Sequence, residues 1–368
     1  LAARTYNATA AGTGASFAAP YFQTLTLQDG PRYTQRNSLS VKADWRVTTN
    51  GVLSASVQQN TFTNDVGIYQ LLMNAGALGT PSIAGGTPLT FGPDFTSGAT
   101  GRGAISMQGL FYKLRGTTRS GNVRYRHEDG TWKIEGGVSR SSSSTTFRDT
   151  DDGHFYNVIS QINPAIRISF TEINHNAPGK FQLFNNANQP VNFYDIANHR
   201  VTQASSSLRD VKDDVTTGDL SVGRQFNGFV VPLSIKIGGA YRQQERDARM
   251  RFKVWTFNGP DGNAATIESA APYVTQVYNG RNSDFGFVGI PWISPHRVWQ
   301  AYQQQPNLLS QTAAQVVAEE SFRITNSEAV QEAVSAGFAQ TELRLFQNRL
   351  NLLTGVRYEK TVGKGQGE

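Results

Sequence analysis

Four places along the chain combine a period-two alternation of apolar and polar residues with a tight polar turn, which is the pattern of a β-hairpin. The turns lie at Thr49-Asn50-Gly51, Asp129-Gly130, Asn227-Gly228 and Phe346-Gln347-Asn348-Arg349. Asn-Gly supplies the positive φ values of a type I′ turn, whose twist matches that of antiparallel strands. The pattern therefore predicts four hairpins, or about eight strands.

Long segments of another composition separate these hairpins, at about residues 63–103, 143–209 and 247–327. They are rich in Gly, Pro, Asn and Ser but also carry Phe, Tyr and Trp, which is typical of ordered loops. Loops longer than about 12–15 residues are uncommon in compact soluble domains. Outer-membrane barrels, in contrast, combine short periplasmic turns with long extracellular loops.

Three segments within these long stretches have a pattern of their own. Residues 105–116 look strand-like, and we assign them either to the first loop or to the upper extension of the strand that follows. Residues 295–306 and 307–321 have helical spacing and predict two short helices inside the third loop.

Composition agrees with a sheet-and-turn protein and excludes thiol chemistry. The 368 residues include 36 Gly and 21 Phe but 0 Cys, so neither a disulfide framework nor a thiolate metal site is possible. The net charge of +6 comes without a basic run, so it does not predict nucleic-acid binding. Lipopolysaccharide phosphates or an anionic ligand fit it better, and an ordinary solvated surface fits it best.

Membrane signals of the helical kind are missing from the sequence. No run approaches the roughly 18 apolar residues of a membrane helix. The first residues lack the basic and apolar regions of a signal peptide, so the chain is either cytoplasmic or has lost its beginning.

A transmembrane β-strand needs only about 9–11 residues and alternates lipid-facing with lumen-facing side chains. In the last hairpin Leu350, Leu352, Val356 and Tyr358 alternate with Asn351, Arg357 and Glu359. We expect the first set to face lipid and the second to face the lumen. Leu353 is the exception, an apolar residue on the lumen side, and we expect it to press against a plug, a globular domain that fills the lumen. A soluble sandwich would alternate too, so the long loops and the aromatic residues near strand ends (Trp45, Trp132, Tyr241 and Tyr358) favour the membrane alternative.

No convincing catalytic site is present. The five histidines (His127, His154, His175, His199 and His296) are expected to lie far apart, at the surface or in loops. The cluster Asp149, Asp151 and Asp152 with Gly153 offers carboxylates for calcium, but the EF-hand spacing fails and a solvated loop tip is favoured. The glycine-rich end, residues 363–367, opens no helix and is interpreted as a flexible loop.

The third long loop contains the best candidates for ligand contact. Aromatic rings stack on sugars or chelate rings, and Arg pairs with carboxylates. The candidates are Trp255, Tyr278, Trp292, His296, Arg297 and Trp299. The alternative is that these side chains pack the loop against itself.

Several segments resemble the TonB-dependent outer-membrane receptors. The segments are Phe338-Ala339-Gln340, Leu345-Phe346-Gln347-Asn348-Arg349-Leu350 and Gly355-Val356-Arg357-Tyr358-Glu359-Lys360-Thr361, with residues 32–47 and 291–306. The resemblance implies that residues 1–368 are a partial antiparallel transmembrane β-barrel without the plug domain and without the closing C-terminal strand.

The same resemblance implies a function and partners for the parent protein. The family performs energised uptake of scarce ligands such as iron chelates, cobalamin or glycans across the outer membrane of Gram-negative bacteria. Its partners would be outer-membrane lipid, lipopolysaccharide, and TonB through a plug domain outside this chain, with no resident cofactor and no enzyme activity. The alternative is a secreted or surface all-β binding protein or adhesin.

Overall fold

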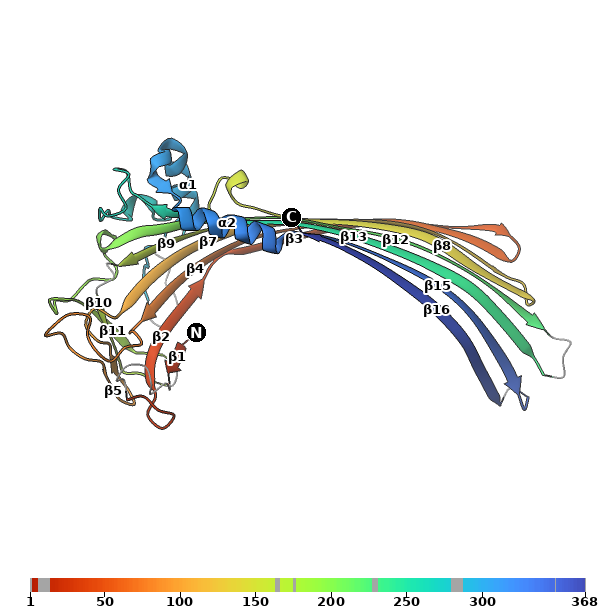
Figure 1. Ribbon diagram of the computed structural model, residues 1–368, viewed down its shortest axis with the longest axis horizontal. Helices are drawn as coiled ribbons and strands as arrows, with labels where there is room; N and C mark the ends of the chain where they lie inside the picture. Colours follow the sequence, from red (N-terminus) through yellow and green to blue (C-terminus); the bar gives the residue numbers. More distant parts are fainter. Residues whose placement is uncertain are drawn as a thin grey trace.

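The computed structural model describes residues 2–5, 14–162, 166–174, 177–226, 231–278, 287–347 and 349–367. Within these residues the dominant element is one twelve-stranded antiparallel sheet, which forms a long arch in Figure 1. Its strands are β1 (Ala2–Thr5), β2 (Tyr21–Asp29), β3 (Arg32–Thr48), β4 (Gly51–Asn74), β7 (Ala104–Glu128), β8 (Trp132–Arg148), β9 (Asn157–Ile162), β12 (His199–Phe226), β13 (Leu233–Phe257), β14 (Leu309–Ser310), β15 (Glu328–Leu345) and β16 (Leu350–Gly367).

Most of the remaining elements are short and lie at one end of the arch, which we call the loop end, while α2 runs from there to the middle of the arch (Figure 1). A second sheet contains β5 (Thr90–Phe91), β6 (Thr96–Ser97), β10 (Ile166–Thr171) and β11 (Lys180–Asn185). The helices are α1 (Pro295–Gln304) and α2 (Ala313–Asn326), with 3-10 turns η1 (Thr150–Asp152), η2 (Ile196–Asn198), η3 (Ala271–Tyr273) and η4 (Pro306–Leu308). In the described part of the chain no helix is both long enough and apolar enough to cross a bilayer.

The strand pairing confirms the all-β, antiparallel prediction and the four hairpins. β3 pairs with β4, β7 with β8, β12 with β13, and β15 with β16. β2 and β3 both pair with β4, so together they form one strand line with an interruption. β8 and β9 both pair with β7 and β12 and form a second interrupted line. Eight long strand lines therefore lie side by side, and the short β1 adds a ninth at the edge of β2.

The turns differ from the expectation in one case. Gly51 is already the first residue of β4 and pairs with Thr48, and neither Asn50 nor Gly51 has a positive φ. The expected type I′ turn at Asn50-Gly51 is therefore wrong. The register shifts between Arg46 and Thr48, and such a bulge increases the local right-handed twist. It therefore provides the twist that a type I′ turn would otherwise supply. The turn residues Asn227, Gly228 and Asn348 lie outside the described residues.

The strands continue further toward the loop end than the sequence pattern indicated. The segments left between the long strands are residues 75–103, 149–198 and 258–327, of which the second contains β9 and the third β14. Residues 105–116 belong to β7, as the extension of that strand. The flexible-loop interpretation of residues 363–367 is wrong, because the edge of β15 pairs with them as far as Glu328 opposite Gly367.

The first predicted helix is present as α1. The second is present but shifted, because η4 and β14 occupy the start of the range 307–321 and α2 covers residues 313–326. Both helices are capped at their N-terminal ends. The Ser294 hydroxyl accepts from the backbone N–H of Arg297 at the start of α1, and Thr312 and Gln315 form a capping box at the start of α2. β15 begins only opposite Ala248, so the rest of β13 would have an open edge. α2 lies along β13 there (Figure 1), and the Ser327 hydroxyl bonds both the N–H and the C=O of Met250.

Candidate functional site

One face of the sheet carries a continuous exposed apolar surface in the half that ends in the tight turns, and we call it the apolar band. Val41, Val138 and Val356 are 57%, 63% and 75% exposed. The band consists of alternate residues within 39–47 on β3, 53–57 on β4, 121–125 on β7, 132–138 on β8, 218–226 on β12, 233–241 on β13, 337–343 on β15 and 350–358 on β16. Arg224 is the one charged residue among them, at the edge of the band near the turns. Leu350, Leu352, Val356 and Tyr358 all belong to it, on the face expected to meet lipid.

On every one of these eight strand lines the next residue on the same face, toward the loop end, is polar. These residues form the polar border: Asn37, Gln59, Arg119, Arg140, Thr216, Gln243, Ser335 and Lys360. A change from apolar to polar at one level on eight strands is what the boundary between hydrocarbon and headgroups demands, because a charge in hydrocarbon is costly.

The apolar band runs obliquely across the strand register. Ala43, its midpoint on β3, lies in the same cross-strand row as Lys360 of β16. The midpoint on β16 is Thr354, six residues away, because 360 − 354 = 6. With about 3.4 Å per residue and about 4.8 Å per strand step, this offset over seven steps is a slope of about 30°. Membrane barrels tilt their strands by about 35–45°, so the slope is close to what they require.

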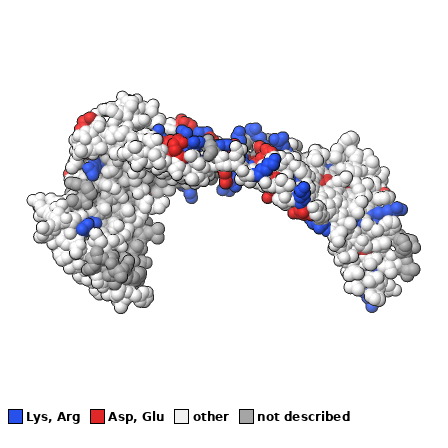
Figure 2. Space-filling view, in the orientation of Figure 1, with Lys and Arg blue, Asp and Glu red and all other residues white. Residues whose placement is uncertain are grey.

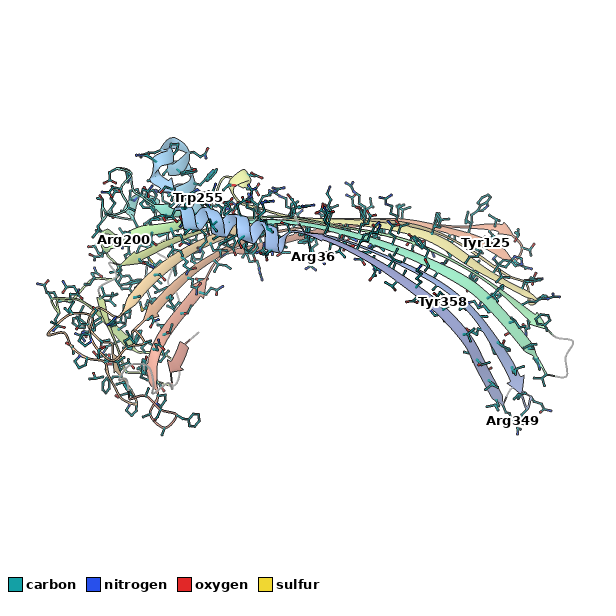
Figure 3. The ribbon with its side chains drawn as sticks, viewed as in Figure 1. Arg36, Tyr125, Arg200, Trp255, Arg349 and Tyr358 are labelled. Atoms are coloured by element: carbon teal, nitrogen blue, oxygen red, sulfur yellow. The ribbon has the colours of Figure 1, made fainter. Side chains whose placement is uncertain are left out.

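Aromatic residues lie near both edges of the band. Trp45 and Trp132 lie toward the turns, where the Arg224 guanidinium is 5.0 Å from the Trp132 ring centroid. Tyr241 and Tyr358 lie next to the polar border. Figure 3 places Tyr125, Tyr358 and Arg349 in the turn half of the arch, and Trp255 and Arg200 at the loop end.

The opposite face is polar and is tied together by ion pairs, so we call it the polar face. Arg124 pairs with Asp219 at 2.8 Å, Lys236 with Glu135 at 3.5 Å, and Arg242 with Glu332 at 3.2 Å. Leu353 is an exposed apolar residue on this face. Figure 2 shows the charged residues gathered along the middle of the arch and toward its turn end, while the loop end is largely uncharged.

The six loop candidates separate into contact groups at the loop end. Tyr278 and Trp292 lie against Tyr69 of β4, with ring centroids 4.8 Å and 5.6 Å away. Trp255 and Trp299 surround Phe155 at 5.4 Å and 5.1 Å. Trp292 is 1% exposed, so its ring is covered by protein. These contacts favour packing of the loop over ligand contact for the tryptophans.

His296 and Arg297 begin helix α1 and keep accessible surface. Arg297 donates to the carbonyl of Pro272 at 3.4 Å. The His296 ring lies 4.9 Å from the ring of Phe111 and 5.0 Å from that of His154. The expectation that all five histidines lie far apart is therefore wrong for this pair, because α1 packs on β7 and β9. His175 lies outside the described residues.

The histidine pair is held in its neutral form. Loss of water around the ring, followed by the charges of His154 and Lys113, lowers the pKa of His296 to about 4. Burial also lowers the pKa of His154, whose Nδ1 lies 2.9 Å from the carbonyl oxygen of Phe155. Two neutral rings can pack against each other without charge repulsion, and here their planes are tilted by 44°.

The aspartate cluster serves the fold. Asp149 is fully buried, and its carboxylate accepts from the Ser206 hydroxyl at 2.8 Å and from the Ser207 N–H at 2.6 Å. Asp151 lies 3.4 Å from Arg148, and Asp152 lies 2.9 Å from Arg115. The carboxylates therefore point at separate partners within the protein, and the solvated loop tip expected for Asp149 is wrong.

An aromatic cluster on the polar face was not anticipated from the sequence. Tyr112, Phe147 and Tyr156 lie with ring centroids 5.0–6.5 Å apart, and Phe252 is 6.4 Å from Tyr156. The Arg209 guanidinium is 5.4 Å from the Phe147 ring, and no carboxylate among the described residues pairs with it. Burial raises the pKa of Tyr156, so its phenol is a neutral hydrogen-bonding group. Every ring of the cluster falls in a segment that the pattern assigned to a loop, or left between loop and strand.

Among the comparisons with known proteins, only the one with solved structures finds similarity. A scan against family models finds no match, and a comparison with curated proteins finds none. The chain is similar to two solved iron-chelate receptors. The ferric preacinetobactin receptor BauA of Acinetobacter baumannii is 7% identical at a TM-score of 0.34, over 94% of this chain and 42% of the receptor.

The second is the ferripyoverdine receptor of the outer membrane of Pseudomonas aeruginosa, solved bound to ferripyoverdine. It is 10% identical at a TM-score of 0.34, over 93% of this chain and 37% of that receptor. The chain thus spans about two fifths of the length of the receptors to which it is similar. Similarity at this level says nothing about what the chain binds.

Proposed function

We propose that this chain forms part of the β-barrel of a TonB-dependent receptor, in the outer membrane of a Gram-negative bacterium. The receptor would take up a scarce ligand such as an iron chelate, cobalamin or a glycan. The observation that carries the proposal is the apolar band, with its polar border and its oblique course across eight strand lines. Such a band matches the lipid-facing surface of a tilted barrel wall.

A secreted binding protein or adhesin would have to cover the same band. Exposed apolar surface costs about 25 cal/mol per Å² in water, so a soluble sheet buries it against a second layer. Among the described residues the second sheet lies at the loop end and leaves the band uncovered (Figure 1). This arrangement favours the membrane function over the soluble one.

The polar face would line the lumen, and its aromatic cluster is the part best suited to a ligand. Tyr112, Tyr156 and Phe252 offer ring surfaces, and Arg209 offers an unpaired cation beside them. A ferric chelate with carboxylate or catecholate groups fits rings plus a guanidinium. His296 packs on Phe111, whose side chain points to the other face of β7 from that of Tyr112, so any ligand contact by His296 and Arg297 would be a separate one on the outer side of the loop end. Trp255, Tyr278, Trp292 and Trp299 would hold the third loop in place.

Energy coupling would need groups beyond this wall. We propose that a plug domain outside these 368 residues fills the lumen, meets the polar face and contacts TonB. The ion pairs and the exposed Leu353 on the polar face suit a protein surface packed against them. Outer-membrane lipid and lipopolysaccharide would meet the opposite face.

The first experiment is localisation of the full-length protein in a Gram-negative host. We expect it in the outer-membrane fraction, with heat-modifiable migration on a gel, because a closed barrel resists detergent until it is heated. Recovery in the soluble or secreted fraction would rule out the barrel and support the adhesin.

Ligand binding is tested separately on the purified receptor. We expect Arg209→Gln to weaken binding of a carboxylate-bearing ferric chelate about tenfold, since a charge-assisted hydrogen bond is worth about 1.5 kcal/mol or more. Arg36→Gln is the matched control, because Arg36 lies on the polar face away from the cluster (Figure 3). Equal losses in both variants would exclude the cluster as the ligand site.

A further inference from the structure

Two arginines of the polar border have no counter-charge. Arg140 lies directly opposite Thr216, and Arg119 lies on the neighbouring strand, opposite Ser142. Both are exposed, and no carboxylate in the described part of the chain forms an ion pair with either. Arg119 donates to the side-chain oxygen of Gln59 at 3.2 Å. Cations further toward the loop end on the same strands are paired, such as Arg115 with Asp152.

An apolar groove begins directly below Arg140 on the same face. Its volume is about 880 Å³, and it crosses β8, β12, β13 and β15 within the apolar band. Val138, Leu220, Ile237 and Tyr241 form its sides. Val138 is the next residue on the face below Arg140, so the cation lies about 7 Å along the strand from the groove wall.

Glycines form the floor of the groove. At Gly337 nothing within the sheet requires a glycine, whereas at Gly239 an added Cβ would press on the carbonyl oxygen of Ala336. At Gly238, on the polar face, an added Cβ would lie 2.6 Å from the Phe338 ring, so that glycine makes room for an aromatic side chain. At Gly239 the nearest heavy atom would be 3.3 Å away, and at Gly337 it would be 4.0 Å away. Neither has a positive φ, although glycine weakens a strand interior. The space above Gly337 is therefore open to a group from outside the chain.

We propose that the groove and the two arginines bind an anionic, phosphate-bearing acyl lipid of the outer leaflet. This inference rests on the proposed function, because it places the apolar band in the bilayer. One acyl chain lies over Gly239 and Gly337, and the phosphate lies at Arg140 with Arg119 and the Thr216 hydroxyl beside it. Guanidinium binds phosphate through two parallel hydrogen bonds, and an unpaired cation at the headgroup level provides the matching charge.

The structure favours a lipid over a free anion because the cation and the groove are continuous. A free phosphate would use the arginines and leave the groove empty. An uncharged lipid would use the groove and leave the arginines without a partner. A molecule with both parts, anchored in the same bilayer, satisfies both features at once.

The test uses the full-length receptor in detergent micelles and measures lipid binding by native mass spectrometry. The probes are diphosphorylated lipid A, the same lipid without its phosphates, and inorganic phosphate. We expect R119Q/R140Q to bind diphosphorylated lipid A at least tenfold more weakly and the dephosphorylated lipid unchanged. We expect G337L, which fills the groove above the open glycine position, to weaken binding of both lipids at least fivefold.

The controls lie on the polar face. R126Q removes an exposed arginine of β7 that makes no ion pair among the described residues, and G363L fills open space on β16. Both should bind lipid A like the native receptor. Equal loss in R126Q, equal affinity for the two lipids, or full competition by inorganic phosphate would each overturn the lipid site.

Heat-modifiable migration of every variant separates failure of the proposed barrel from failure of the lipid site. If the native receptor is absent from the outer membrane, the proposed function fails and the lipid site fails with it. If the barrel forms and R119Q/R140Q still binds lipid A like R126Q, only the lipid site is overturned.

Discussion

The assignment of the two faces predicts opposite responses to one charge placed on β16. Val356 lies in the apolar band opposite Ala339 and is 75% exposed. Thr361, five residues along the same strand, lies on the polar face opposite Val334. Val356→Arg therefore places an arginine toward lipid, and Thr361→Arg places the same side chain toward the lumen.

The expected loss of stability follows from the depth of residue 356 in the bilayer. Val356 is one same-face position from Thr354, the midpoint of the band on β16, which is about 5 Å of depth after allowing for strand tilt. An arginine costs about 2–4 kcal/mol at the midplane of a barrel wall and about 0–1 kcal/mol at the interface. We therefore expect Val356→Arg to lower the free energy of unfolding by about 2 kcal/mol, or about 30-fold in the equilibrium constant. Thr361→Arg should change it by less than about 0.5 kcal/mol.

The assay is guanidinium unfolding of the full-length receptor in phospholipid vesicles, followed by tryptophan emission. Folding should be shown to be reversible before free energies are compared. Equal destabilisation by the two variants, or a larger effect of Thr361→Arg, would refute the assignment of the apolar band to lipid.

Three further predictions concern single contacts. Gly238→Val should destabilise the receptor by about 1–3 kcal/mol in the same assay, because its Cβ would meet both the Phe338 ring and the Leu220 carbonyl, whereas Gly337→Val should cost much less. Ser327→Ala should cost about 1 kcal/mol and speed hydrogen exchange at Met250, since it frees the backbone at the edge of β13; unchanged exchange would contradict the role of that hydroxyl. The lowered pKa values of His154 and His296 mean that the unfolded loop binds protons more readily than the folded one, so α1 should loosen as pH falls from about 6.5 toward 4. Hydrogen exchange of α1 measures this. His296→Phe should reduce the pH dependence, and removing it fully should require replacement of His154 as well.

Local patterns predicted the hairpins because their causes are local. Alternation at Leu350, Leu352 and Val356 sets the face of each side chain, and a polar turn sets where the strand reverses. The helix at α1 was predicted for the same reason, since Ser294 and Pro295 are start signals within one turn of the helix they begin.

Strand ends and the candidate site depended on contacts distant in sequence. Residues 63–74, 199–209 and 247–257 carry no clean alternation, yet each continues its strand because a neighbouring strand pairs with it. Tyr112, Phe147 and Phe252 form a cluster only once β7, β8 and β13 are in register, and His154 meets His296 only through the packing of α1.

By itself the sequence determined the strand class, the hairpins, the two-faced character of each strand and the absence of thiol chemistry, since each of these follows from side-chain type and from period two. Only the tertiary structure decided that the polar border is continuous across eight strand lines and that the apolar band runs obliquely to the rows of paired residues. It also decided that Arg119 and Arg140, which form no ion pair among the described residues, lie beside an open groove. The physical reason is that register between strands is a relation among residues as much as 110 positions apart, as between Leu233 and Leu343. No local pattern of hydrophobicity contains that relation.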